Sequence, residues 1–132
     1  MSQENVEIVR RMIEAWGRGD YSAALESIDP DIEVIVAYQS DLDGSYRGHA
    51  GLAQVLEVFW TEFEGPRIQI EEALPAGSEV VVGVRFHGRG KRSGAEIDAP
   101  AWHAWRLREK KAVRWQLFRT KQEALEAAGL RE

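Results

Sequence analysis

The feature that most constrains the fold is a change of hydrophobic period near Gly65-Pro66, about midway along the 132 residues. Before this point, apolar residues recur mainly every three or four positions, as on one face of an α-helix. From Arg67 onward, apolar and polar residues alternate, as in strands with one buried face. A chain divided in this way predicts an α+β fold, in which helices cover one face of an antiparallel sheet.

The predicted elements run helix, helix, strand, helix and then four strands, with a closing helix at the end. Ser2 caps the first helix, which Gly17 and Gly19 end. The other elements are a short helix at 20–28, a strand at 32–37, a polar loop at 38–48, a helix at 49–63, strands at 68–74, 80–86, 101–107 and 112–119, and a helix at 120–129. We expect a single domain over residues 1–132, with a strongly curved mixed sheet that forms a cone around the three N-terminal helices.

Composition excludes several classes of function. The net charge of −5 and the pI of about 5.3 disfavour nucleic acids and acidic membranes as partners, because both need a basic surface. The absence of cysteine excludes disulfides and thiol catalysis. No apolar run is long enough to span a bilayer, and the N-terminus does not resemble a signal peptide, so we expect a cytoplasmic protein.

The predicted strand at 101–107 carries a histidine on its apolar side. Alternation puts His103 and Trp105 on one face and the charged pair Arg106 and Arg108 on the other. The face with the arginines is solvated, so the His103 face points inward. A titratable group among apolar neighbours is either a hydrogen-bonded core residue or the polar centre of a ligand pocket, and both interpretations stay open.

The hairpin loop that follows this strand predicts a partner for His103. If Glu109-Lys110 form a two-residue loop, His103 faces Gln116 on the neighbouring strand. A loop one residue longer would instead turn Trp115 inward. Because Glu-Lys lacks the glycine that fixes a turn type, this second register remains an alternative.

In the first register, the outer face of the sheet carries a large apolar patch. Its members are Trp102, Val113, Trp115 and Leu117. A monomer rarely exposes a patch of this size, so we predict a homodimer that forms through this face.

The inward residues define a candidate pocket for a small hydrophobic ligand. Its catalytic candidates are His103, whose ordinary pKa lies near neutrality, and Gln116, which can equally be a structural partner of the imidazole. The candidate substrate-binding side chains are Trp16, Tyr38, Val84, Phe86, Trp105 and Phe118. Three histidines on separate elements do not supply the converging ligands of a metal site, so no metal and no other cofactor are expected.

Several short motifs resemble those of one family. They are Ala15-Trp16 before Gly19-Asp20, Asp29-Pro30-Asp31, Tyr46-Arg47-Gly48, Gly88-Arg89-Gly90 with Ser93-Gly94, and the stretch from Glu123 to Leu130. Over nearly its whole length, the chain resembles the SnoaL-like (polyketide-cyclase-like) branch of the nuclear-transport-factor-2-like superfamily. The resemblance implies the cone fold and a homodimer. It implies no single activity, because this superfamily houses isomerases, cyclases, dehydratases, epoxide hydrolases and non-catalytic domains.

Two catalytic patterns of the superfamily are incomplete here. The tyrosine of ketosteroid isomerases falls on Met12, their aspartate base near Val36 and their second acid on His103. The arginine and aspartate of limonene-type epoxide hydrolases fall on Ala101 and His103. Two functions stay open. One is acid–base isomerisation, cyclisation or dehydration of a small hydrophobic carbonyl or hydroxyl compound, and the other is a non-catalytic ligand-binding or dimerisation module.

Overall fold

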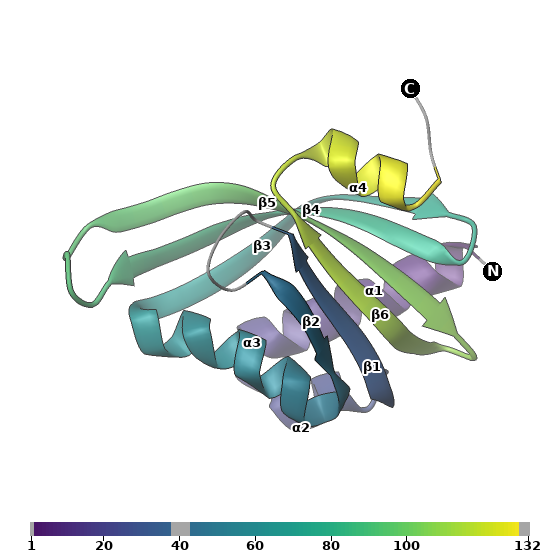
Figure 1. The fold of residues 1–132 in the computed structure, drawn as a ribbon, viewed down its shortest axis with the longest axis horizontal. Helices are drawn as coiled ribbons and strands as arrows, with labels where there is room; N and C mark the ends of the chain where they lie inside the picture. The colour runs from purple at the N-terminus through teal and green to yellow at the C-terminus, as the bar shows by residue number, and fades with distance from the viewer. Residues whose placement is uncertain (1, 38–42, 130–132) are drawn as a thin grey trace.

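The computed structural model describes residues 2–37 and 43–129, which form one curved, open sheet of six strands with helices on both faces (Figure 1). The elements are α1 (Ser2–Gly17), α2 (Tyr21–Leu25), β1 (Ile28–Ala37), β2 (Gly44–Arg47), α3 (Gly48–Glu62), β3 (Phe63–Ala76), β4 (Glu79–Gly90), β5 (Glu96–Arg108), β6 (Lys111–Phe118) and α4 (Lys121–Ala127). The strand order is β2-β1-β6-β5-β4-β3. Strands β3 to β6 form an antiparallel meander, and β1 joins β6 in parallel. The predicted α+β fold with a curved mixed sheet is confirmed.

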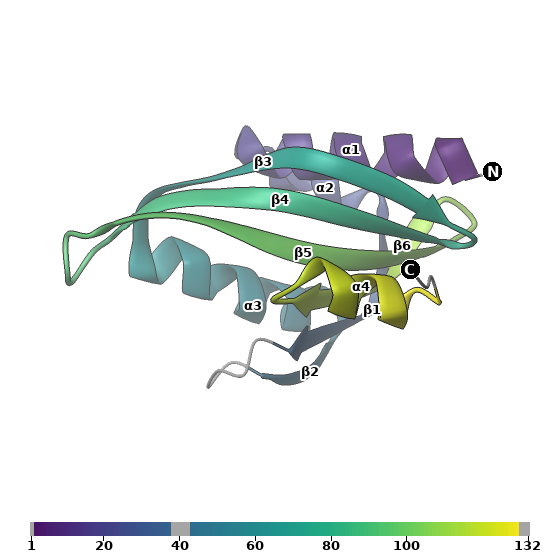
Figure 2. The ribbon, with the colours of Figure 1, turned by 90° about the horizontal axis from the view of Figure 1, so that it is seen from above.

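The inner face of the sheet is covered by the N-terminal helices. On α1, Val9, Met12 and Ile13 are almost completely buried, as their helical spacing predicts. They belong to one core cluster with Leu52 and Val55 of α3 and with inward residues of the strands. Figure 2 shows α1 and α4 on opposite sides of the sheet, so the inner core is built without α4.

Two boundaries differ from the sequence prediction. Strand β2 lies inside the stretch predicted as loop, where Tyr46 pairs with Val34 of β1. Strand β1 begins at Ile28, four residues earlier than predicted, because Ile28 pairs with Ala112 of β6. Both differences come from pairing with distant strands, which local propensity does not report.

The outer face of the sheet is covered in part by α4. The Thr120 side chain caps this helix by accepting a hydrogen bond from the backbone N–H of Glu123 at 3.2 Å. The second core cluster beneath α4 consists of Val81, Ala124 and Leu125, with Leu74, Trp102, Phe118 and Ala128 packed against it. An apolar helix face thus covers apolar residues of the outer sheet face.

Trp102 is held in this outer layer from both sides. Below it lies Gly83, where an added Cβ would come within 2.5 Å of the indole ring. Above it, the ammonium group of Lys121 lies 5.5 Å from the ring centroid, in reach of a cation–π interaction. The absence of a side chain at position 83 is therefore what lets the indole lie flat on the strand.

The turn between β5 and β6 has the predicted length, but an extra residue follows it. Glu109 and Lys110 take φ values of 52° and 67°, as in the turns that close two-residue hairpins. Leu107 pairs with Ala112, yet the next pair along the ladder is Arg106 with Arg114. Val113 is therefore a β-bulge, a residue on β6 without an opposite partner.

The bulge reverses which side chains of β6 face the core. Beyond it, Trp105 pairs with Trp115 and His103 pairs with Leu117. The prediction that Gln116 faces His103 is wrong, because Gln116 pairs with Ala104. The alternative with Trp115 inside is the observed one, reached through a bulge at Val113 and not through a longer loop.

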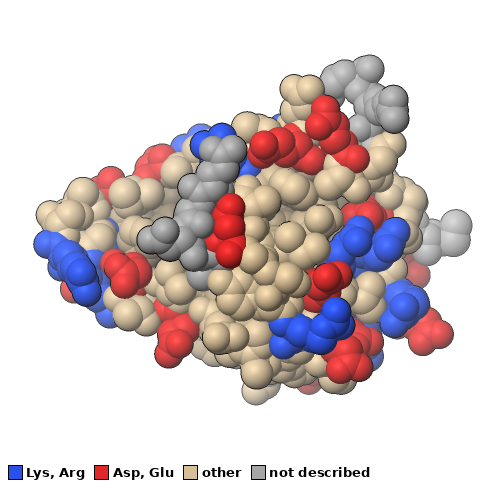
Figure 3. Space-filling view, in the orientation of Figure 1, with Lys and Arg blue, Asp and Glu red and all other residues tan. Residues whose placement is uncertain are grey.

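A row of charged residues crosses the outer face where α4 does not cover it. Direct cross-strand pairs connect Glu79, Arg106, Arg114, Glu33 and Arg47, one residue on each of five adjacent strands. Glu79 is buried and accepts from Arg114 at 3.2 Å, while the nitrogen Nε of Arg106 lies 3.7 Å from the same oxygen. In Figure 3, acidic and basic side chains gather on the lower right of the molecule, over the ends of β1, β5 and β6. Glu79 offsets the repulsion between two arginines that the bulge places directly opposite each other.

The register of β6 predicts opposite effects at two adjacent positions. Trp115→Ala should lower the free energy of unfolding by about 3–5 kcal/mol, because it empties a large buried volume. Gln116→Ala should change it by less than about 1 kcal/mol. Urea unfolding of both variants checks this, and a larger loss at position 116 would contradict the observed register.

Candidate functional site

A cavity opens between the end of α1, α3 and the inner face of the sheet. It is lined by Trp16, Gly17, Tyr21, Leu56, Pro66, Ile68, Phe86, His103, Trp115 and Leu117. Its empty space is about 560 Å³ when the part that opens to solvent is counted. About 50 Å³ is open to the centre of a water molecule. This is room for roughly three to five waters. The cavity is a narrow, mostly apolar slot.

His103 is the polar side chain buried in this slot. It is 4 % exposed, and its position on β5 directs it inward next to Leu117 of β6. Its ring meets the ring of Trp115 nearly at a right angle, with 5.2 Å between the centroids. In the part of the chain that the structure describes, Nδ1 is buried and has no hydrogen-bond partner. The imidazole is thus held by aromatic packing and not by a carboxylate.

Three tryptophans build the wall next to the histidine. The rings of Trp105 and Trp115, which are direct cross-strand partners, stack at 4.9 Å with planes 9° apart. Trp16 of α1 lies across both of them, with centroid distances of 5.8 and 5.5 Å. Aromatic pairs of this kind stabilise a structure by more than the area they bury. They place apolar rings against one side of His103.

Burial keeps the imidazole uncharged. Desolvation lowers the pKa of His103 from its ordinary value of 6.5 to about 3. None of the described residues that line the cavity is acidic. His103 is therefore neutral at physiological pH, and without a ligand it is a weaker base than the sequence led us to expect.

The structure places the sequence-predicted residues in different surroundings. Trp16, Phe86 and His103 line the same cavity. Val84 and Trp105 are buried in the inner core and are not among the lining residues. Tyr38 lies outside the described residues.

Two candidates point away from the cavity. Gln116, predicted to hold His103, lies on the outer face opposite Ala104. Phe118, predicted as a pocket residue, packs in the outer cluster beneath α4. The bulge at Val113 is the physical reason for both errors, because shifting a strand by one residue exchanges its two faces.

The same shift explains why the sequence prediction did not include two of the residues that line the cavity. Trp115 and Leu117, expected outside, line the cavity. Leu56 and Ile68 lie on faces that the sequence periods mark as apolar, and that signal could have added them to the site. Tyr21, at the start of α2, brings a phenol to the cavity although its side chain is 40 % exposed. Partial burial raises the pKa of Tyr21, so the phenol stays protonated.

A wider groove adjoins the cavity between α2 and α3. About 440 Å³ of it is open to the centre of a water molecule, and it shares Trp16, Tyr21 and Leu56 with the cavity. His49 lies in its wall, and the His49 ring Nε2 is 3.1 Å from the carbonyl oxygen of Ile28. That contact ties the first turn of α3 to β1. The groove and the slot meet at the three side chains that they share.

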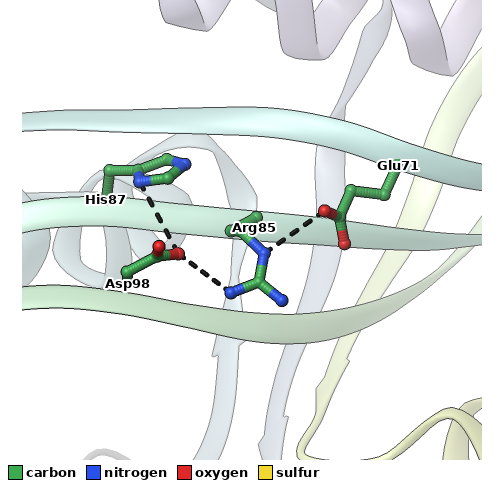
Figure 4. A network of polar contacts seen from close by, with 4 residues as sticks. All are labelled: Glu71, Arg85, His87 and Asp98. Atoms are coloured by element: carbon green, nitrogen blue, oxygen red, sulfur yellow. Dashed lines mark hydrogen bonds and ion pairs between the residues drawn. The ribbon is translucent and has the colours of Figure 1, made fainter.

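The other polar cluster on the central strands faces away from the cavity. Figure 4 shows Arg85 between two carboxylates, with 2.9 Å from Nη1 to Asp98 and 3.2 Å from Nε to Glu71. Nδ1 of His87 lies 3.6 Å from the same Asp98. The hydrogen bond from Arg85 lowers the pKa of Asp98. The cluster connects β3, β4 and β5 across the exposed outer face.

The apolar patch from which we predicted a homodimer interface is not present. Trp115 and Leu117 lie in the inner core, and Trp102 packs beneath α4. Among the described residues, the large hydrophobic side chains classed as exposed are Tyr21 and Ile97. The homodimer therefore stays a prediction without that patch.

Within residues 2–37 and 43–129, no three His, Asp or Glu side chains converge in the way a metal site requires. None of the helices described has both the length and the apolar character needed to cross a bilayer.

Comparison with known proteins identifies the family. Residues 9–115 match the sequence profile of the SnoaL-like domain, and the chain belongs to this family. No curated protein matches the sequence. The resemblance found in the sequence motifs is thus confirmed for the family, and it carries no specific activity with it.

Solved structures show the same fold over nearly the whole chain. TerC, co-crystallised with polyporic acid, is 24 % identical with a TM-score of 0.78, covering 96 % of this chain and 98 % of TerC. A nuclear-transport-factor-2-like protein from Burkholderia xenovorans LB400 is 29 % identical with a TM-score of 0.73, covering 97 % and 98 % of the two chains. A protein of ketosteroid-isomerase-like fold from Catenulispora acidiphila DSM 44928, in complex with trimethylamine, is 18 % identical with a TM-score of 0.74, covering 95 % and 94 %.

The lowered pKa of His103 predicts a loss of stability in acid. Between pH 6.5 and about 3, the unfolded chain binds a proton at this residue and the folded chain does not, so stability falls as the pH falls. The contribution is about 1.4 kcal/mol per pH unit, or roughly 2 kcal/mol between pH 6.5 and 5. Urea unfolding across this range should show a shallower pH dependence in His103→Phe than in the natural chain.

The matched control is Ile68→Val, which changes the packing of the same cavity without removing a titratable group. It should keep the pH dependence of the natural chain. An unchanged slope in His103→Phe would mean that His103 is protonated in the folded protein.

Proposed function

We propose that this chain binds a small, largely apolar carbonyl or hydroxyl compound in the slot above His103. The observation that carries the proposal is a buried imidazole that lines an apolar cavity and whose Nδ1 has no hydrogen-bond partner among the described residues. An apolar filling of the cavity would leave the other ring nitrogen buried without a hydrogen bond as well, at a cost of roughly 1–3 kcal/mol. A ligand that hydrogen-bonds to that nitrogen avoids this cost.

The dimensions of the slot define the ligand further. Space for a few waters suits a single ring or a short branched chain. A larger molecule would extend past Trp16, Tyr21 and Leu56 into the groove between α2 and α3. The co-crystallisation of TerC with polyporic acid and the trimethylamine complex of the Catenulispora protein support ligand binding by this fold.

Filling the slot should abolish binding. Leu56→Trp places an indole where a ligand would lie, and should weaken the binding of acetophenone and 1-phenylethanol at least about tenfold. Ile97→Trp on the exposed part of β5 is the matched control and should leave binding unchanged. Titration followed by NMR signals of the indole N–H groups gives the affinities. Equal affinities in the natural chain and Leu56→Trp would remove the slot as the binding site.

Acid–base catalysis is the second candidate function. It is favoured because the polar group that meets a bound ligand is itself a proton-exchanging imidazole. The low pKa makes His103 a weak base in the empty slot, so proton transfer requires a substrate that stabilises the imidazolium. Isomerisation, cyclisation and dehydration all contain such a step.

Proton transfer and simple binding are separated by isotope exchange. If His103 removes a proton next to a carbonyl, the methyl protons of acetophenone should exchange with D₂O faster in the presence of the natural chain than with His103→Phe. Mass spectrometry of the recovered ketone measures the exchange. Binding without accelerated exchange would favour the non-catalytic module for this compound.

A homodimer also belongs to the proposal, now on different grounds. Part of the charged row lies on β2, β1 and β6, where Arg47, Glu33 and Arg114 carry both signs. It lies on the outer face, outside the apolar cluster beneath α4. Such a surface can pair with a second copy of itself about a twofold axis. Light scattering of the purified chain gives the number of copies directly.

A further inference from the structure

The two nitrogens of the His103 ring differ in what they can reach. Nδ1 is shielded from solvent and from the cavity, and it has no hydrogen-bond partner among the described residues. Since the side chain lines the cavity, Nε2 is the nitrogen that a ligand can meet. Any ligand that hydrogen-bonds to His103 therefore does so through Nε2.

A neutral imidazole carries a single N–H, so its position decides what kind of ligand fits. A proton on Nδ1 would add another buried donor with no acceptor to the indole N–H groups of Trp105 and Trp115, which also have none among the described residues. Each such donor costs free energy, so a further one is unfavourable. A proton on Nε2 leaves Nδ1 as an unpaired acceptor and turns the donor toward the slot. With the proton on Nε2, the N–H donor lies where an acceptor in the slot can reach it.

We propose that His103 presents Nε2–H to the cavity as a hydrogen-bond donor, and that the ligand class is a neutral compound with an acceptor oxygen, above all a ketone or aldehyde. This inference rests on the proposed function, because it takes the slot to be a ligand site. It adds the direction of the hydrogen bond to that proposal: the ligand's oxygen accepts from Nε2–H, which is the one role a carbonyl oxygen can take.

The charge of the ligand follows from the surroundings. Among the described residues that line the slot, there is no lysine, no arginine and no acidic side chain. A carboxylate would lose its hydration there without gaining a cationic partner, which is unfavourable. A neutral carbonyl loses much less hydration free energy, and a hydrogen bond from one N–H donor compensates that loss. Burial, which lowers the pKa of His103, also keeps the ring neutral.

The donor role gives His103 a function that needs no protonation. An N–H directed at a carbonyl oxygen in a dry site polarises the carbonyl and stabilises negative charge on its oxygen. A neutral imidazole serves as such an electrophilic donor in other enzymes. In this arrangement, His103 binds and polarises the ligand, and it does not have to act as the base.

The position of the proton is measured directly by nitrogen NMR of the ligand-free natural chain with ¹⁵N-labelled histidine. We expect the signal of His103 to show an N–H at Nε2 and a bare nitrogen at Nδ1 across neutral pH. A proton on Nδ1, for example directed at the ring of Trp115, would overturn the proposal. This measurement needs no ligand and no variant, so it is independent of whether the slot binds anything.

The ligand class is tested with two probes of nearly equal shape. Acetophenone has a carbonyl where α-methylstyrene has a CH₂ group, so the pair differs in its acceptor. We expect acetophenone to bind about tenfold more tightly to the natural chain, as one hydrogen bond in a dry site warrants. In His103→Phe, the two compounds should bind alike.

The outcomes separate the two proposals. Equal affinities in the natural chain would overturn the donor role while leaving the slot as an apolar binding site. Tighter binding of indole, which only donates, than of acetophenone would assign the proton to Nδ1 and also overturn the donor role. If none of the three compounds binds, the proposed function fails, and the nitrogen spectrum still decides the state of His103.

Discussion

The β-bulge at Val113 is the constraint on which the interior of this protein depends. It places one residue of β6 outside the ladder, and every side chain beyond it then faces the opposite side. Trp115 thereby comes to lie directly across from Trp105, and both rings stack beneath Trp16. Without the bulge, Arg114 would lie opposite Trp105 in place of the indole, and Gln116 would lie opposite His103 in place of Leu117.

The aromatic wall explains why the histidine behaves as it does. Trp105 and Trp115 pack against His103 with apolar rings and provide no counter-charge. Their packing replaces the carboxylate that usually orients a catalytic imidazole. The ring is therefore fixed in place and kept neutral by the same contacts. A group with these properties is better suited to hold a ligand's oxygen than to withdraw a strongly bound proton.

The sequence predicted the architecture well because hydrophobic period is a strong signal over long segments. The helix pattern of α1 and the alternation in β4 and β5 were sufficient for the fold, and alternation alone turned His103 inward. The bulge has no such signal, since Val113 is an ordinary strand residue and its displacement depends on pairing with β5 and β1. The errors at Gln116 and Phe118 follow from that single residue. Strand β2 was missed for a related reason, because its pairing with β1 is a tertiary contact.

The hairpin of β5 and β6 also limits how the family can vary in length. Residues 109–113 combine a two-residue turn with one bulged position, so inserting or deleting a single residue there would exchange the two faces of β6. The hairpin of β4 and β5 has no such restriction at its tip, which projects beyond α3 in Figure 1 and Figure 2. A change in the length of that tip leaves the pairing of β4 with β5 unchanged. Homologues that keep an indole beside the cavity must instead keep the number of residues between β5 and that indole odd or even, as it is here.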